Sequence, residues 1–317
     1  MKSKTHKAIF VSVVIISIFG LPKLLNLAAA QRLGQIVYSK DSLYQRIFVY
    51  QNGPVTTLRF GRQPPIQAQT RVNLNNLREH MLEYTMLTFS GLLYKPEPKK
   101  ILVVGLGGGV IPREMRYYYP NVEIDAVEID SEIPPIAEQF FSFREDEKLK
   151  VHISDGRTFI KKQLRNEPVP KYDLIILDAF NNDYIPFHLM TKEFLEEVKG
   201  VLSDDGAVVA NVFYRNRLFD AEFKTYLAAF ERCQVFLGTY SNNAILVAPG
   251  PKAPTLTPSG ATNRAKMWQQ KHKPAFNMIW VARRLRPKLR PGKYAKVLTD
   301  DRAPVNQLRN QTTRTLP

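Results

Sequence analysis

Apolar positions in the middle of the chain alternate between short continuous runs and helically spaced stretches. The continuous runs, rich in β-branched residues, are 101–105, 123–129, 151–154, 172–178, 207–213, 234–240 and 244–249. The helically spaced stretches between them are 112–119, 131–141, 157–164, 191–202 and 220–232. Strands buried on both faces and alternating with helices are typical of a doubly wound parallel sheet. We therefore predict an α/β domain over residues 96–250.

A shorter region with a different pattern precedes this domain. Residues 42–53 alternate and end in the turn signal Asn52-Gly53, and residues 55–61 form a second strand candidate. Leu77–Leu93 then has helical spacing. The pattern predicts a small β-rich N-terminal domain over 35–95 that leads into a helix.

The first 31 residues differ from both regions. Three lysines precede an apolar run, 8–21, and three alanines follow at 28–30. This order is typical of a secretory signal, and the run is shorter than the roughly 20 residues that a spanning helix needs. We expect residues 1–31 to be an export signal or an uncleaved membrane anchor, with a soluble helix or a misassigned start as the alternative. The protein would then be membrane-associated, or exported after cleavage. The N-terminal lysines favour a body outside the membrane, and the sequence leaves the side of the membrane open.

Composition narrows the class of protein. The 317 residues include 44% hydrophobic side chains, which excludes global disorder. A single cysteine, Cys233, excludes a disulfide framework and cysteine-clustered metal sites, and we expect it to be a small core residue.

The net charge of +16 is placed unevenly. Residues 251–299 contain twelve Lys or Arg and no acid, and 251–260 has the composition of a linker. We expect residues 251–317 to form a basic C-terminal segment. It is either a solvated face or a contact for an anionic membrane surface. Nucleic acid is disfavoured because no nucleic-acid module signature is present.

Candidate chemistry falls at the ends of the predicted strands, where open α/β sheets bind ligands. The first strand ends in a glycine-rich turn, Gly105–Gly109, that lets a ligand approach the backbone. Glu128 follows 19 residues later, at the spacing of a ribose ligand, although Asp130 could cap the next helix instead. Because no Lys-Ser/Thr pair follows the glycines, a nucleoside such as S-adenosylmethionine fits, and a dinucleotide is not excluded.

Two further acids end the third and fourth strands. Asp155, before Gly156, could accept a hydrogen bond from the amine of adenine, or cap a helix. Asp178 would face the mouth of the pocket in a catalytic or substrate role, with a cap or loop bond as the alternative. We expect His188, just after the fourth strand, to be a core or loop histidine rather than a base.

The motifs together resemble a known family. ILVVGLGGG, DAVEID, SDG, YDLIILDAF and IPFHLMTKEFLEEVKGVLSDDGAVVAN are similar to the spermidine/spermine synthases (polyamine aminopropyltransferases), and closest to a spermidine-synthase-like branch often fused to membrane segments. The resemblance covers residues 42–308. It implies a Rossmann-like methyltransferase core behind a small N-terminal β-domain. It also implies aminopropyl transfer from decarboxylated S-adenosylmethionine to putrescine or a similar amine, and dimerisation through the N-terminal domain.

The resemblance also assigns roles to residues of this chain. The donor would be a co-substrate rather than a bound cofactor, and its sulfonium leaving group would need no metal. Asp178 would orient the attacking amine and accept its proton. The tail, ribose and adenine of the donor would be held by Gly105, Gly107, Gly109, Glu128, Asp155 and Gly156. The amine pocket would be bordered by Gln67, Tyr84, Asn181 and Asp183.

Two departures from the family pattern keep other functions open. Gly108 stands where the family has an Asp that holds the donor's amine, and Asn181 stands at the usual second acid. A methyltransferase or aminocarboxypropyl transferase that uses S-adenosylmethionine is one alternative. A non-catalytic, membrane-linked protein that retains the fold is another.

Overall fold

The computed structural model describes residues 33–61, 68–180, 185–214 and 216–311. The expected leader, 1–31, and three expected site residues, Gln67, Asn181 and Asp183, lie outside these ranges. Among the residues that are described, no helix is both long and apolar enough to cross a membrane.

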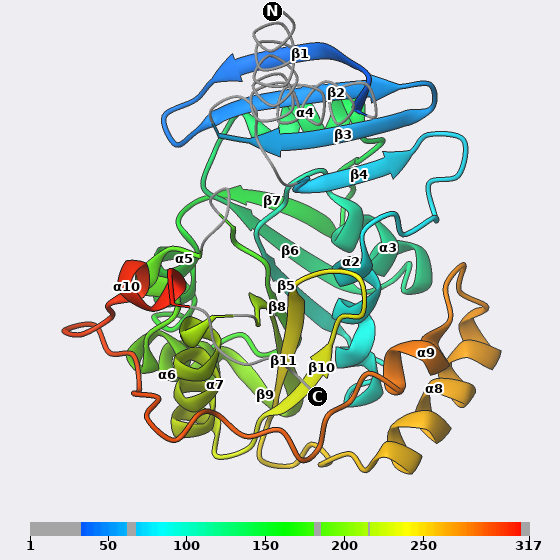
Figure 1. Cartoon of the computed structure of the whole chain (residues 1–317). Helices are drawn as coiled ribbons and strands as arrows, with labels where there is room; N and C mark the ends of the chain where they lie inside the picture. The colour runs from blue at the N-terminus through cyan, green and yellow to red at the C-terminus, as the bar shows by residue number, and fades with distance from the viewer. Residues whose placement is uncertain (1–32, 62–67, 181–184, 215, 312–317) are drawn as a thin grey trace, which may run out of the picture.

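Four antiparallel strands form the smaller of two sheets, at the top of Figure 1. In spatial order they are β1 (Gln35–Asp41), β2 (Arg46–Asn52), β3 (Val55–Phe60) and β4 (Thr70–Asn73). The Asn52-Gly53 turn joins β2 to β3, and Gly53 there has a φ of +56°. The small sheet therefore occupies the region in which the sequence pattern predicted strands.

The larger sheet has seven strands, in the order β10-β11-β9-β8-β5-β6-β7. Their bounds are Lys100–Val104 (β5), Glu123–Glu128 (β6), Leu149–Ile153 (β7), Tyr172–Leu177 (β8), Leu202–Phe213 (β9), Gln234–Leu237 (β10) and Asn243–Pro249 (β11). The strands from β9 to β7 run parallel, and at one edge β11 pairs antiparallel with β9 and β10 pairs antiparallel with β11. This is the expected Rossmann-like, mostly parallel sheet. The strand order reverses between β5 and β8, which is where such sheets open a crevice at their carboxyl ends.

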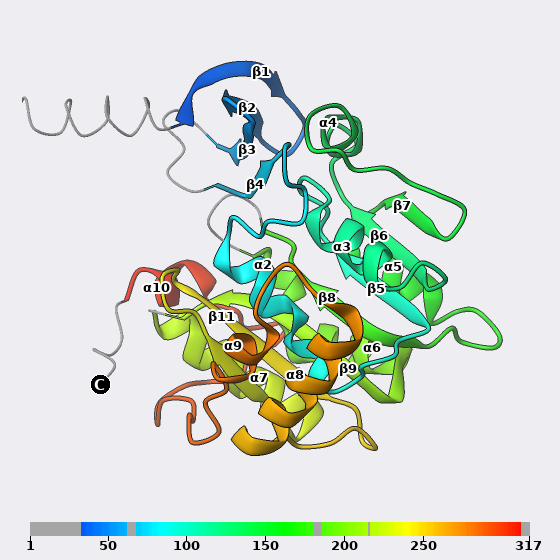
Figure 2. The ribbon, with the colours of Figure 1, turned by 90° about the vertical axis from the view of Figure 1, so that its right-hand side faces the viewer.

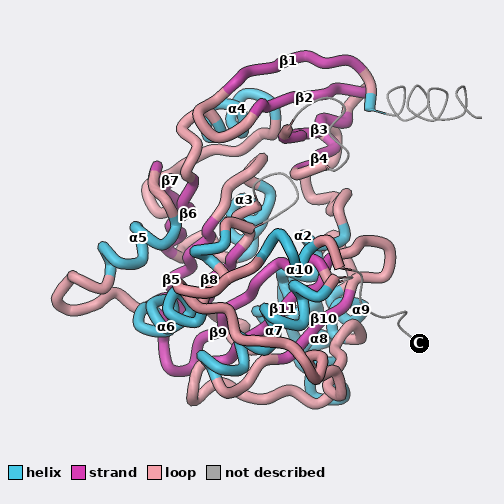
Figure 3. Tube along the Cα trace, turned by 60° about the vertical axis from the view of Figure 1, so that its left-hand side comes forward, coloured by secondary structure: helices cyan, strands magenta, loops and turns pink. Residues whose placement is uncertain are grey.

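Helices cover both faces of the larger sheet. One face packs against α5 (Gly156–Gln163), α6 (Lys192–Val201) and α7 (Arg217–Phe230), of which α5 and α6 lie at the left of Figure 3. The other face packs against α2 (Glu83–Thr88), η1 (Phe89–Leu93), α3 (Val110–Tyr118), α8 (Pro258–His272) and α9 (Met278–Ala282), and α2, α8 and α9 come forward in Figure 2. Two short helices, η2 (Phe187–Leu189) and α10 (Val305–Arg309), lie on the connections that follow β8 and α9.

The two sheets share one apolar core. Ile47 and Leu58 of the small sheet belong to the same buried cluster as Ile101 and Val103 of β5. The helix α4 (Ile133–Phe140) lies beneath the small sheet, with the rings of Tyr38 and Phe140 5.4 Å apart. Because burial of shared apolar area drives this contact, the small sheet is held as a fixed wall above the larger one.

The helix expected over Leu77–Leu93 is shorter than predicted. It begins only at Glu83 and tightens into a 3₁₀ helix from Phe89. The side chain of Asn73 accepts a hydrogen bond from the Asn75 amide, and Arg113 holds the Leu77 carbonyl oxygen. Local turn bonds of this kind compete with a helix, so the Asn-rich stretch before Glu83 stays in turns.

The strand expected over 234–240 also ends early, at Leu237. The next residues form a turn whose backbone amides, from Thr239 to Ser241, donate to the carboxylate of Glu83 on α2. Those amides cannot also serve a strand ladder, so the strand stops there.

The expected basic C-terminal segment packs against the core of the larger sheet. The side chain of Trp268 on α8 is only 3% exposed, and its indole nitrogen donates to the Tyr119 hydroxyl at 2.8 Å. The expected linker 251–260 is attached to β10, because the amide of Leu256 donates to the side chain of Gln234. Helix α8 already begins at Pro258. Apolar positions of the segment complete the core on the α2 side of the sheet, although the strong cationic bias masks them in the sequence.

Candidate active site

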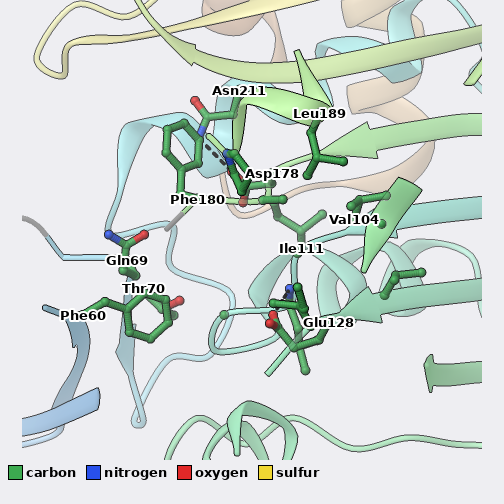
Figure 4. Close-up of a pocket in the computed structure, with 18 of the residues that line it drawn as sticks. Phe60, Gln69, Thr70, Val104, Ile111, Glu128, Asp178, Phe180, Leu189 and Asn211 are labelled. Atoms are coloured by element: carbon green, nitrogen blue, oxygen red, sulfur yellow. Dashed lines mark hydrogen bonds between the residues drawn. The ribbon is translucent and has the colours of Figure 1, made fainter. Parts of the chain in front are cut away.

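A cavity of about 260 Å³ lies between the small sheet and the carboxyl ends of the parallel strands. Figure 4 shows Phe60, Gln69 and Thr70 on one side of it and the strand ends that bear Glu128 and Asp178 on the other. This is the position that the strand-order reversal between β5 and β8 predicts for a ligand.

The glycine turn after β5 brings two parts of the cavity together. Gly105 has a φ of +98°, and a Cβ there would lie 2.4 Å from the carbonyl oxygen of Asp178. No residue other than glycine fits this approach. Gly105 and Gly107 line the cavity, whereas Gly109 caps α3 against the ring of Phe143 and does not line it.

Thr70 of β4 closes the same turn from the small sheet. Its hydroxyl accepts a hydrogen bond from the Gly108 amide at 2.8 Å, and a Cβ at Gly108 would lie 2.5 Å from the Thr70 methyl carbon. The ring of Phe141 stands 3.0 Å away on the other side. The aspartate that the resemblance implies at this position therefore has no room in this chain.

Glu128 is the strand-end acid that lines the cavity on the β6 side. Its two carboxylate oxygens accept hydrogen bonds from the amides of Leu106 and Asp130, each at 3.0 Å. Burial raises its pKa, and these backbone bonds oppose the rise. Asp130 is buried and accepts a bond from Ser42 at 2.5 Å, so of these two acids only Glu128 faces the cavity.

Asp155 lines the cavity and caps α5 at the same time. One carboxylate oxygen accepts a bond from the Thr158 amide at 2.9 Å, and the other lies 2.8 Å from His188 Nε2. Burial alone would raise the pKa of Asp155, but the bonds from His188 and Thr158 outweigh it and hold the pKa below its usual range. Because each carboxylate oxygen has two lone pairs, Asp155 can still accept a bond from a ligand amine.

His188 is a loop histidine, as expected, and it also bonds to the cavity acid Asp155. It is positioned on η2, beside a clamp in which Arg157 holds both Glu197 and Asp300 by paired hydrogen bonds of 2.7–2.9 Å. The bonds from Arg157 lower the pKa of Asp300 to about 2. The clamp connects the C-terminal segment to α5 and α6. No sequence spacing predicts it, because its members come from three distant stretches.

Asp178 follows β8 at the centre of the cavity. Its Oδ1 accepts a hydrogen bond of 2.8 Å from the amide nitrogen of Asn211, whose own oxygen accepts one of 2.9 Å from Asn243. Burial raises the pKa of Asp178 to about 7, against a lowering by the Asn211 bond. Asn211 was not singled out from the sequence, although an amide inside the apolar run AVVANVF is the signal that could have found it.

Tyr84 borders the cavity where the resemblance placed it, on α2. Its hydroxyl donates to the carbonyl oxygen of Gln69 at 2.8 Å, and the Gln69 side chain lines the cavity. The rings of Phe180 and Phe213, which meet edge to face 5.0 Å apart, also line the cavity. The lining therefore combines aromatic walls with the carboxylate of Asp178.

The cavity is negative within a cationic protein. Its described lining contains three carboxylates, those of Glu128, Asp155 and Asp178, and no Lys, Arg or His. Such a surface attracts cations such as a sulfonium or an alkylammonium. Across the described ranges, no three His, Cys, Asp or Glu side chains group in a way that could hold a metal ion.

Known proteins share both the sequence and the fold. Residues 80–257, over half of the chain, match the spermine/spermidine synthase domain. The chain belongs to this family. It is 39% identical over 220 residues to the polyamine aminopropyltransferase of Vibrio vulnificus, covering 68% of this chain and 72% of that one. It is accordingly a transferase of the polyamine aminopropyltransferase type.

Two solved structures support the assignment of the fold. A probable spermidine synthase from Corynebacterium glutamicum matches with a TM-score of 0.64 at 17% identity, over 86% of this chain and 99% of that one. The human methyltransferase-like protein 13, solved with S-adenosylhomocysteine (SAH), matches with a TM-score of 0.57 at 27% identity, over 62% and 94%. The family core is thus shared between aminopropyltransferases and methyltransferases.

The His188 contact predicts a role in nucleoside binding. Replacing His188→Ala removes a charge-assisted bond to Asp155 and should weaken binding of methylthioadenosine about tenfold. Calorimetric titration of the full chain measures this. His152→Ala is the matched control, since His152 pairs with Asp125 at 2.7 Å and does not line the cavity. Equal losses in the two variants would contradict the role.

The raised pKa of Asp178 predicts an opposite pH dependence of stability for two variants. The folded protein holds this proton more tightly than the unfolded chain, so ionisation of Asp178 costs stability as pH rises from about 4 through about 7. Asp178→Asn should therefore gain in Tm over the wild type as pH rises across that window.

Asp146→Asn is the control with the opposite sign. Burial opposes ionisation of Asp146, but bonds from Lys148, Arg116 and Leu149 lower its pKa, so its charge stabilises the fold above about pH 4. That variant should lose Tm relative to the wild type as pH rises to about 4, and the deficit should then stay constant between about pH 4 and about pH 7. Thermal unfolding scans at several pH values measure both, and an Asp178→Asn curve parallel to the wild type would contradict the shift.

Proposed function

We propose that this protein transfers an aminopropyl group from decarboxylated S-adenosylmethionine to a di- or polyamine such as putrescine. The observation that carries the proposal is the carboxylate of Asp178, held by Asn211 in a cavity whose other two acids lie at neighbouring strand ends. Membership of the spermine/spermidine synthase family supports the same class of reaction.

The donor is proposed to lie across the strand ends. Glu128 would accept hydrogen bonds from the ribose hydroxyls, and Asp155 from the adenine amine. Gly105 and Gly107 would lie along the aminopropyl tail, where the absence of side chains leaves room. This orientation directs the sulfonium toward Asp178.

The amine nitrogen of the acceptor attacks the tail carbon bonded to sulfur. The carbon–sulfur bond breaks, its electron pair returns to sulfur, and methylthioadenosine leaves. An alkylammonium has no lone pair, so the attacking nitrogen must be neutral when it reacts, and Asp178 takes the proton that it loses. With a pKa of about 7, Asp178 is available in both protonation states near neutral pH, as a general base should be.

A turnover assay on the full chain tests this function. Decarboxylated S-adenosylmethionine and putrescine are supplied, and spermidine and methylthioadenosine are measured by mass spectrometry. We expect both products in equal amounts, and a loss of roughly a hundredfold or more in Asp178→Asn, the range for removal of a general base. An Asp178→Asn enzyme as active as the wild type would contradict the role of Asp178.

A methyl or aminocarboxypropyl transfer from S-adenosylmethionine is the second candidate, and the glycine turn favours it. Because Thr70 and Phe141 fill the space beside Gly108, no carboxylate stands there to repel a donor that keeps its own. In the same assay with S-adenosylmethionine, S-adenosylhomocysteine would identify methyl transfer. Methylthioadenosine would identify transfer of the tail.

A further inference from the structure

A carboxylate just outside the cavity holds a whole turn of the chain. Glu83, on α2, accepts hydrogen bonds from the amides of Thr239, Tyr240 and Ser241 at 2.6, 2.9 and 2.7 Å, and from the Ser241 hydroxyl at 2.8 Å. Burial would raise the pKa of Glu83, but these bonds outweigh it and lower the pKa. Because hydrogen bonds to an ionised group are stronger than neutral ones, these four bonds hold the β10–β11 connection strongly to α2.

The turn continues directly into the cavity. The Ser241 hydroxyl also accepts a long bond of 3.4 Å from the amide of Asn243, which is the first residue of β11 and lines the cavity. The backbone of Asn243 is fixed further by its carbonyl oxygen, which accepts a bond from Gly238 at 3.0 Å. The backbone of Asn243 is therefore held from two sides, by the turn that Glu83 holds and by its pairing with Phe213 of β9.

From Asn243 the connection reaches Asp178 through one more side chain. The amide nitrogen of Asn243 donates to the oxygen of Asn211, and the amide nitrogen of Asn211 donates to Asp178 Oδ1. An amide whose oxygen already accepts a bond must present its NH₂ group on the other side. Asn243 thus orients the side-chain amide of Asn211 so that its NH₂ group, a hydrogen-bond donor, faces Asp178.

The same helix also sets the opposite wall. Tyr84 follows Glu83 directly and borders the cavity, with its hydroxyl on the Gln69 carbonyl oxygen. A substitution at Glu83 would therefore disturb both the route through Asn211 and the wall formed by Tyr84. The charged and titratable groups beside this path include Tyr84, which lies close enough to Asp178 to be affected by its charge, and Tyr240 of the turn itself. Arg284 also donates to the Thr239 hydroxyl.

We propose that Glu83 is a positioning residue that orients Asp178 and favours its ionised form, acting through the 239–241 turn, Asn243 and Asn211. The proposal rests on the proposed role of Asp178 as the base. Asn211 donates to Asp178 Oδ1, so Oδ2 remains to take the amine proton. When the path is broken, Asn211 turns away, Asp178 loses a donor and its pKa rises.

The test compares Glu83→Gln with the wild type across pH. Loss of one hydrogen bond to an ionised group raises a pKa by about one unit, which reduces the ionised fraction of Asp178 at pH 7 from about half to about a tenth. We therefore expect kcat to fall about fivefold at pH 7 and to recover by about pH 9, with the KM for the donor nearly unchanged.

Asp146→Asn is the matched control, because Asp146 also holds a turn through two backbone amides, those of Lys148 and Leu149, but lies outside the cavity. It should lower Tm and leave the pH profile in place. A Glu83→Gln enzyme that loses Tm as this control does, with no shift in its pH profile, would overturn the proposal.

A second measurement does not depend on turnover. The side-chain amide resonance of Asn211, identified by its loss in Asn211→Asp, should titrate with Asp178 at about pH 7 in the wild type. In Glu83→Gln its midpoint should move to higher pH. If the Asn211 midpoint shifts but no amine is ever modified, Glu83 does act on Asp178 and the proposed function is wrong. If turnover is normal and the midpoint does not move, the proposed route from Glu83 to Asp178 is wrong.

A double-mutant cycle with Asn243→Ala tests the route itself. If Glu83 acts through Asn243, the double variant should show the same midpoint as Asn243→Ala alone, since coupled residues are not additive. Additive shifts would mean that Glu83 does not act by way of Asn243, and would overturn the assignment of the path.

Discussion

The whole site depends on one close approach, in which the turn after β5 passes beneath the backbone of Asp178. Only glycine fits at position 105, because a Cβ would lie 2.4 Å from the Asp178 carbonyl oxygen. The approach brings the predicted donor turn and the predicted base to the same edge of the sheet. Thr70 then fastens the small sheet to that turn through Gly108, so the wall opposite the strand ends is fixed by the same contact.

Charge and burial act together in this arrangement. The chain carries a net charge of +16, yet the described lining of its cavity contains carboxylates and no cationic side chain. Burial raises the pKa of Asp178 and of Glu128, whereas hydrogen bonds lower the pKa of Asp155. The site therefore contains acids of different strength within one cavity, which suits a reaction that binds a cation and also accepts a proton.

Much of this could be predicted from the sequence, because periodicity and strand-end chemistry are local signals. The parallel strands, the glycine turn and the acids Glu128, Asp155 and Asp178 all follow from such signals. The C-terminal segment could not be read in the same way, since its buried positions, such as Trp268, are scattered among cations. The Asn243–Asn211 pair and the His188 contact were missed for a related reason: each joins residues far apart in the chain, and no short spacing marks them.

We propose that the negative cavity binds a cationic adenosyl donor beside Asp178. Calorimetric titration of the full chain with decarboxylated S-adenosylmethionine, S-adenosylmethionine and methylthioadenosine measures this binding. The decarboxylated donor, whose tail carries no carboxylate, should bind most tightly to a cavity lined by acids. If none of the three binds, the cavity is not a donor site, and the chain has the family fold without the family chemistry.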